Sequence, residues 1–149
     1  MDMKFRFILP KGPEYCRERM LRWEALDKSL GRPPNFEVLS EDEKSLHLIA
    51  LHGKKLVGCI CFLPETGTQG KIFEMAVSQE YQGRGFGRQL LLTLERSLIE
   101  KGILDVYLHA HIEFESFYQR LGYLGEGDVF VKMGQSLKRM KKSLSSTDH

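Results

Sequence analysis

Three glycines at alternate positions separate a short apolar run from a long leucine-rich one. The segment reads Gln82-Gly83-Arg84-Gly85-Phe86-Gly87-Arg88. The pattern predicts a strand over residues 71–77, a bare loop, and a helix over residues 85–101. The first N–H groups of a helix have no partner within it and lie at the positive end of its dipole. The loop is therefore predicted to bind an anion, and a phosphate suits it.

Length and composition are those of an ordinary globular protein. The chain has 149 residues, 28% of them charged, and a net charge of +2. We expect one domain over residues 1–142 and a fraying tail over residues 143–149. The small net charge predicts no nucleic-acid partner, because such proteins carry a stronger basic bias. A short basic cluster keeps nucleic-acid binding open as an alternative, and it consists of Lys138, Arg139, Lys141 and Lys142.

No targeting or metal framework stands out. No apolar stretch reaches the ~18 residues that a membrane span needs. The N-terminus opens with an acidic residue and lacks a signal-peptide pattern, so we expect a cytoplasmic protein with no membrane partner. Cys16, Cys59 and Cys61 form no disulfide or zinc framework. Cys59 and Cys61 are expected to be small buried residues on one face of a strand.

Apolar periodicity predicts strands and helices along the whole chain. Residues 45–63 should form an antiparallel hairpin. A strand, helix and strand over residues 71–110 should form a crossover that makes the two strands parallel. Further strands are expected at residues 4–9, 129–132 and 136–140, helices at 14–30 and 113–121, and an irregular surface connector at 35–44. The predicted class is α/β, of the α+β kind.

Two motifs carry a likeness to a known family. Gln82–Gly87 fits Q-x-x-G-x-G, and Phe117–Tyr123 resembles F-Y-x-x-x-G-[FY]. Both are similar to segments of the GNAT superfamily of N-acetyltransferases, the first being its acetyl-CoA signature. The resemblance covers residues 4–142. It implies a mixed, mostly antiparallel twisted sheet of about six or seven strands, with a parallel central pair and helices on both faces. Two other glycine motifs do not fit. A Rossmann fingerprint would need a glycine where Arg88 stands, and a P-loop would need Gly-Lys-Ser/Thr, which is absent here.

The resemblance also implies where acetyl-CoA would lie. The fourth and fifth strands splay apart, and the pantetheine arm pairs with the edge of the fourth strand. Met75, Ala76 and Val77 would supply the backbone groups, and the Val77 amide would donate to the thioester oxygen. The two arginines would add charge, with a solvated surface role as the alternative for each. The pyrophosphate would lie against Gln82, Gly83, Arg84, Gly85, Phe86, Gly87 and Arg88.

The implied reaction is direct attack of a primary amine on the thioester, which needs an acid and a base. Tyr118 stands at the family's general-acid position. The glutamate and histidines that some members use as the base are missing, and Glu74 is the carboxylate that remains on this strand. Strict alternation points Glu74 with Ile72 and Ala76, although a bulge would re-aim it. A water chain to the backbone or to a histidine is an alternative base.

The histidines and the acceptor leave several possibilities open. His111 stands where the family often has an asparagine that touches the cofactor, and it is expected to bind the arm or to act as a base. No metal is expected, because no carboxylate or cysteine completes a site with His109 and His111. His47 and His52 are expected on the surface. The acceptor amine stays undefined, although the acidic residues 41–43 could attract a cationic one. A monomer or homodimer is expected, and a non-catalytic acyl-CoA-binding module on the same fold is the alternative function.

Overall fold

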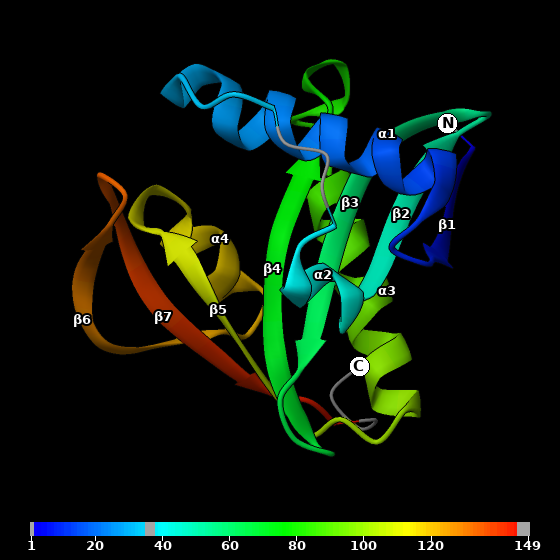
Figure 1. Ribbon diagram of the computed structural model, residues 1–149. Coiled ribbons are helices and arrows are strands. Elements are labelled where there is room, and N and C mark those ends of the chain that lie inside the picture. Colours follow the sequence, from blue (N-terminus) through cyan, green and yellow to red (C-terminus); the bar gives the residue numbers. More distant parts are fainter. Residues whose placement is uncertain (1, 35–37, 146–149) are drawn as a thin grey trace.

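The computed structural model describes residues 2–34 and 38–145. Within this part of the chain, seven strands form one sheet in the order β1-β2-β3-β4-β5-β7-β6 (Figure 1). Neighbouring strands are antiparallel except β4 and β5, which are parallel as the crossover predicted. The predicted mixed sheet is therefore confirmed. The strands are β1 Met3–Ile8, β2 Leu46–His52, β3 Lys55–Pro64, β4 Gln69–Val77, β5 Asp105–His111, β6 Leu124–Lys132 and β7 Gln135–Ser143.

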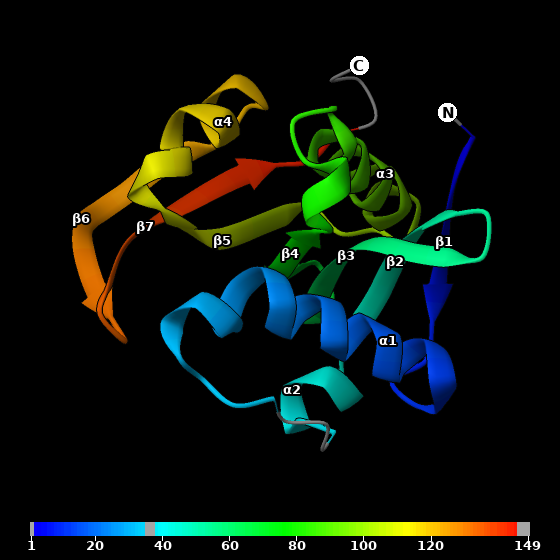
Figure 2. The same cartoon turned by 90° about the horizontal axis from the view of Figure 1, so that it is seen from above.

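Helices cover both faces of the sheet. Helices α3 and α4 lie on one side, which we call the α3 face (Figure 2). Helices α1 and α2 lie on the other side, the α1 face. The α-helices are α1 Gly12–Arg22, α2 Ser40–Glu43, α3 Phe86–Glu100 and α4 Glu115–Arg120, with short turns η1 Trp23–Asp27, η2 Lys28–Leu30, η3 Gln79–Tyr81 and η4 Ile112–Phe114 between them.

Helix α3 is the main cover of the core. Its leucines recur at helical spacing, so they fall on one side of the helix and pack on β2, β3 and β4. Gly85 caps the start of the helix and Gly102 follows its end, and both have a positive φ that suits glycine. The buried leucines are Leu90, Leu91, Leu94 and Leu98. This packing fixes the start of α3 beside the end of β4.

The first helical stretch is less regular than the sequence predicted. One helix was expected over residues 14–30, but α1 ends at Arg22 and continues as a π-helical turn, η1, and then a 3-10 turn, η2. Gly31 closes the stretch with φ 75°. Wider helical turns of this kind are frequent at functional sites. Here the change places residues of η1 over β4.

Two other expectations are corrected. The connector over residues 35–44 includes the helix α2, and its Asp42 is fully buried instead of lying on the surface. Residues 35–37 lie outside the described residues. The tail was expected to fray from residue 143, but Ser143 ends β7 and the Leu144 amide donates to the Leu104 carbonyl over 2.7 Å. Residues 146–149 are outside the described part. None of the described helices is long and apolar enough to cross a membrane.

Candidate active site

Strands β4 and β5 stop pairing soon after they begin. Their register pairs are Gln69 with Asp105, Gly70 with Val106, and Lys71 with Tyr107, and the ladder stops there. Beyond Lys71 each strand pairs only with its outer neighbour, β3 or β7. The edges that face each other beyond this point have no strand between them (Figure 1). Backbone groups on these edges are available to a ligand.

The hydrogen-bond pattern of β4 shows which groups face the splay. The Ser78 amide donates to the Val57 carbonyl of β3 over 2.8 Å. Hydrogen-bonded pairs alternate along an antiparallel ladder, so the Ala76 backbone faces β3 while the Val77 N–H and carbonyl face away from it. The Gln82 side chain donates to that Val77 carbonyl over 2.9 Å. The Val77 amide therefore points into the gap between β4 and β5, whereas the backbone groups of Ala76 pair with β3.

The splay opens into one cleft of about 710 Å³. It runs from the glycine loop, past β4 and β5, to η1 on the α1 face. It contains every predicted site residue except Arg84. That guanidinium lies instead over the Tyr81 ring, 5.6 Å from its centroid. The predicted residues that line the cleft are Glu74, Met75, Ala76, Val77, Gln82, Gly83, Gly85, Phe86, Gly87, Arg88, His111 and Tyr118.

The glycine loop presents backbone to this cleft. Gly83 and Gly85 have φ of 76° and 84°, a left-handed conformation that side chains disfavour. The first helical hydrogen bond runs from the Gln89 amide to the Gly85 carbonyl, which leaves the three preceding amides unpaired within the helix. The Phe86 ring is buried in the core, so this residue offers only its backbone. A Cβ at Gly87 would meet Met75 only at ordinary contact distance, so the protein itself does not require glycine there.

Tyr118 projects from α4 towards the same cleft. Its ring makes edge contacts with Phe117 and Tyr123. Burial raises the pKa of its hydroxyl to about 12. No described residue forms a hydrogen bond with that hydroxyl. The group therefore keeps its proton at neutral pH and is free to donate it to a ligand.

A bulge in β4 directs Glu74 to the α1 face. Glu74 has φ 52°, and the register with β3 shifts between Cys59 and Cys61. As a result Ile72 packs under α3 while Ala76 packs on the α1 face, so strict alternation along β4 is wrong. The Glu74 carboxylate lies 3.6 Å from the Arg22 guanidinium and is 35% exposed. Burial raises the pKa of Glu74. The positive charge of Arg22 lowers this pKa, whereas the nearby carboxylates of Asp27 and Asp42 raise it further.

The two histidines of β5 also line the cleft. His111 contacts the Phe114 ring edge-on, with 6.3 Å between centroids. The pKa of His109 is lowered by burial and by the positive charges of Lys71, Arg139 and Lys132. His109 is therefore neutral near pH 7. Neither histidine belongs to a group of three or more metal-ligand side chains among the described residues.

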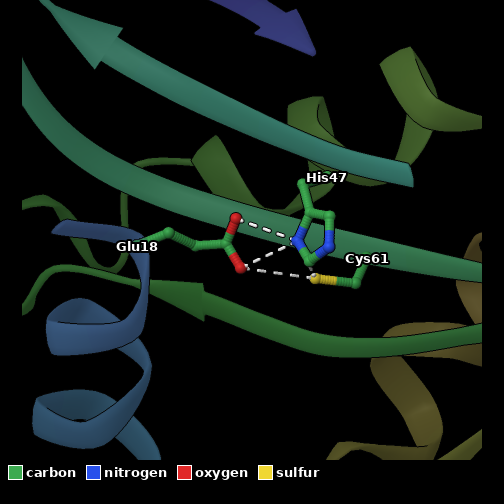
Figure 3. A group of neighbouring side chains, drawn as sticks. All are labelled: Glu18, His47 and Cys61. Atoms are coloured by element: carbon green, nitrogen blue, oxygen red, sulfur yellow. Dashed lines mark hydrogen bonds and ion pairs between the residues drawn. The ribbon is translucent and has the colours of Figure 1, made fainter. Parts of the chain in front are cut away.

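His47 overturns its expectation. Predicted on the surface, it is 0% exposed and lies between Glu18 and Cys61 (Figure 3). Its Nε2 donates to the Asp42 carbonyl over 2.9 Å, and its Nδ1 lies 3.0 Å from both Glu18 oxygens. Both ring nitrogens thus face acceptors, which fits an imidazolium paired with a carboxylate. Burial lowers the pKa of His47, but the hydrogen bond and charge of Glu18 outweigh it and leave the pKa raised.

The cluster extends to Arg22 and, through it, to Glu74. Arg22 donates to Glu18 over 2.9 Å and to Asp42 over 3.0 Å. The Glu18, His47 and Cys61 donor atoms lie within 4.8 Å of one another, a spacing that a metal ion could share. Hydrogen bonds already satisfy Glu18 and His47, and the guanidinium competes for the carboxylate, so the arrangement favours an ion-pair network. Only the i, i+4 spacing of Glu18 and Arg22 hinted at it in the sequence.

Comparisons with known proteins agree with this geometry. The pattern of the acetyltransferase (GNAT) domain family matches residues 13–144. The chain is 34% identical over 70 residues to the GCN5-related N-acetyltransferase 2, chloroplastic, of Arabidopsis thaliana. That match covers 47% of the chain and 27% of the plant protein, so the chain spans about a quarter of that relative.

Solved structures share the fold at low sequence identity. An acyl-CoA N-acyltransferase from Pseudomonas aeruginosa is 21% identical with a TM-score of 0.81, covering 95% of this chain and 99% of that one. A GNAT family acetyltransferase from Elizabethkingia anophelis, solved with acetyl-CoA bound, is 14% identical with a TM-score of 0.73, covering 95% and 98%. At these identities the likeness concerns the arrangement of the chain in space.

Proposed function

Given that the chain belongs to the GNAT family of acetyltransferases, we propose that it transfers the acetyl group of acetyl-CoA to a primary amine. The amine attacks the thioester directly while both substrates are bound. The observation that carries this proposal is the Val77 amide, which faces the splay in the same cleft as the unpaired amides of the glycine loop. Together they offer donors to a thioester oxygen and to a pyrophosphate.

The residues present fit acetyl-CoA. The three amides at the start of α3, with Arg88 beside them, would hold the pyrophosphate, and the β4 edge would hold the pantetheine arm. Bare backbone at Gly87 leaves space for the phosphates to approach. The bound thioester supplies an acyl group that is activated towards nucleophiles. The Val77 N–H would donate to its oxygen as negative charge develops there.

Tyr118 is the proposed general acid. Its hydroxyl is protonated at neutral pH and has no competing partner among the described residues. When the carbon–sulfur bond breaks, the O–H proton would pass to the departing sulfur, so that the thiol leaves neutral. The edge contacts with Phe117 and Tyr123 hold the ring in position for this transfer.

Glu74 is the proposed base, and its pH dependence tests the assignment. The carboxylate would take a proton from the ammonium group of the acceptor, and its raised pKa brings it closer to neutrality. The base works only when ionised, so kcat/KM should rise with pH through the Glu74 pKa. Glu74→Gln should lower kcat/KM by about 10²-fold or more and remove this acid limb. Glu80→Gln, at an exposed carboxylate, is the control. An acid limb that persists in Glu74→Gln would point to a water chain or a histidine instead.

The function itself is tested by two measurements on the purified protein. Titration calorimetry should detect acetyl-CoA binding, and a panel of amines should then release free thiol. No binding at millimolar acetyl-CoA would contradict the proposal. Binding without thiol release from any amine or peptide would favour the non-catalytic acyl-CoA-binding module.

Intramolecular contacts argue against the nucleic-acid alternative. The basic side chains of β7 are largely engaged: Arg139 lies 3.8 Å from the Tyr107 ring centroid, and Lys142 pairs with Glu95 over 2.8 Å. Lys141 lies 3.5 Å from Glu126, and Lys138 donates to the Gly127 carbonyl. Such pairing leaves little free charge to meet a phosphate backbone. We therefore keep nucleic acid and membranes outside the proposed partners, and propose a monomer or homodimer.

A further inference from the structure

The charges that line the cleft do not balance on the α1 face. Asp27 pairs with Arg32 over 2.9 Å, and Glu74 lies 3.6 Å from Arg22. Two further charged residues line this part of the cleft, Lys71 on β4 and Lys132 at the end of β6. Neither ammonium group forms a salt bridge or hydrogen bond with a described residue. After the internal pairs are removed, two positive charges remain.

The two lysines act on the same place from opposite sides. Lys71 is in register with Tyr107 on β5, and alternation puts His109 and His111 on that same face. Lys132 follows Phe130 by two residues on β6, and the Phe130 ring meets His109 with 5.1 Å between centroids. Burial lowers the pKa of His109, and both ammonium groups lower it further together with Arg139, while the Glu65 carboxylate acts in the opposite direction. Their fields therefore converge beside a neutral imidazole that can itself donate a hydrogen bond.

The acidic segment does not offset this charge. The sequence left open that residues 41–43 attract a cationic amine. Asp42, however, is buried and paired with Arg22, so its charge is not presented at the surface. Neither Glu41 nor Glu43 lines the cleft. This end of the site therefore attracts an anion, and Glu74 is the lining carboxylate that we propose as the base for an incoming amine.

We propose that the acceptor carries an anionic group as well as its amine, and that Lys71 and Lys132 bind this group while the amine faces Glu74. The inference rests on the proposed acetyl transfer and names the class of acceptor. Two lysines suit a carboxylate, as in a free amino acid, and equally a phosphate, because each ammonium group acts as a compact point charge with three donors. A cationic polyamine is disfavoured by the same charges.

Matched acceptors test the proposal. L-phenylalanine and its amide share one α-amine and differ in the carboxylate, and O-phosphoethanolamine and ethanolamine do the same for a phosphate. The reaction is followed as thiol release from acetyl-CoA. Since the amide changes the basicity of its amine, the decisive quantity is the ratio of wild-type to variant kcat/KM for each acceptor separately.

The variants are Lys71→Ala and Lys132→Ala. Each should lower kcat/KM for the charged members of at least one pair by about tenfold through KM, the scale of one charged hydrogen bond, and leave the uncharged members unchanged. The pair that responds identifies carboxylate or phosphate. Lys141→Ala is the control, since it removes an exposed lysine that pairs with Glu126 and does not line the cleft. Dissociation constants for acetyl-CoA should not change.

The outcomes separate this inference from the proposed function. Equal losses for charged and uncharged acceptors, or a loss of acetyl-CoA affinity, would overturn the inference and leave acetyl transfer standing. No thiol release from any acceptor would overturn acetyl transfer. In that case, titration of the wild type and of Lys71→Ala with L-phenylalanine and O-phosphoethanolamine in the presence of coenzyme A still decides whether the lysines bind an anion, and no binding to the wild type counts against it.

Discussion

Tyr118→Phe lowers kcat by about 10²-fold or more and leaves the dissociation constant of acetyl-CoA nearly unchanged, if the hydroxyl is the general acid. The substitution removes one oxygen that lines the cleft and has no hydrogen-bond partner among the described residues. The ring contacts with Phe117 and Tyr123 are kept, so the fold should not respond. Steady-state thiol release and titration calorimetry measure the two quantities.

Tyr123→Phe is the matched control for Tyr118→Phe. It also removes one hydroxyl from a neighbouring aromatic ring, but that hydroxyl is buried and donates to Glu95 over 2.6 Å. It should reduce the free energy of unfolding while kcat changes little. A large loss of acetyl-CoA affinity in Tyr118→Phe would make Tyr118 a binding residue. An unchanged kcat would remove it from the mechanism.

Arg22→Met should lower the free energy of unfolding by about 3–5 kcal/mol. Arg22 is 5% exposed and donates to Glu18 and to Asp42, so its loss leaves two buried carboxylates short of a partner. The change is a large part of the roughly 5–15 kcal/mol that holds a domain of this size. Urea unfolding measures it.

Arg6→Met provides the comparison for Arg22→Met. Arg6 also pairs with a glutamate, Glu14, but on the exposed surface, where solvent screens the charges and little stability should be lost. Arg22→Lys keeps the charge without the planar fork and should fall between the two extremes. A loss in Arg22→Met no larger than that in Arg6→Met would mean that the buried carboxylates take up protons and do not depend on the arginine.

The features that the sequence predicted well are those that depend on residues close together in the chain. The glycine loop, the leucine stripe of α3 and Tyr118 each follow from residues close together in the chain. The leucines pack in the core, whereas the glycine loop and Tyr118 line one cleft. Neighbouring strands also followed from short links. The insertion of β7 between β5 and β6 depends on pairing between distant residues, which no local pattern records.

The misses have the same origin. Nothing at Glu74 announces a bulge, because no glycine or proline stands there to mark one, and the register shift is visible only against β3. His47 looked like a hairpin residue until Glu18 and Asp42 were brought to it from other elements. The role of Arg84 stays a prediction: its guanidinium lies over the ring of Tyr81, three residues earlier in the chain. For Glu74 and His47, contacts with other elements decided the outcome.

The short ladder between β4 and β5 divides the sheet into two halves that are joined by few hydrogen bonds. Three register pairs connect them, at the end far from the glycine loop. A ligand that pairs with the β4 edge and contacts β5 would bridge the two halves of the sheet. Ligand binding would then be coupled to folding. It would add about 2.7 kcal/mol to the free energy of unfolding at a ligand concentration of 100 times its dissociation constant. The protein's resistance to unfolding would rise and fall with the cell's supply of the acyl donor.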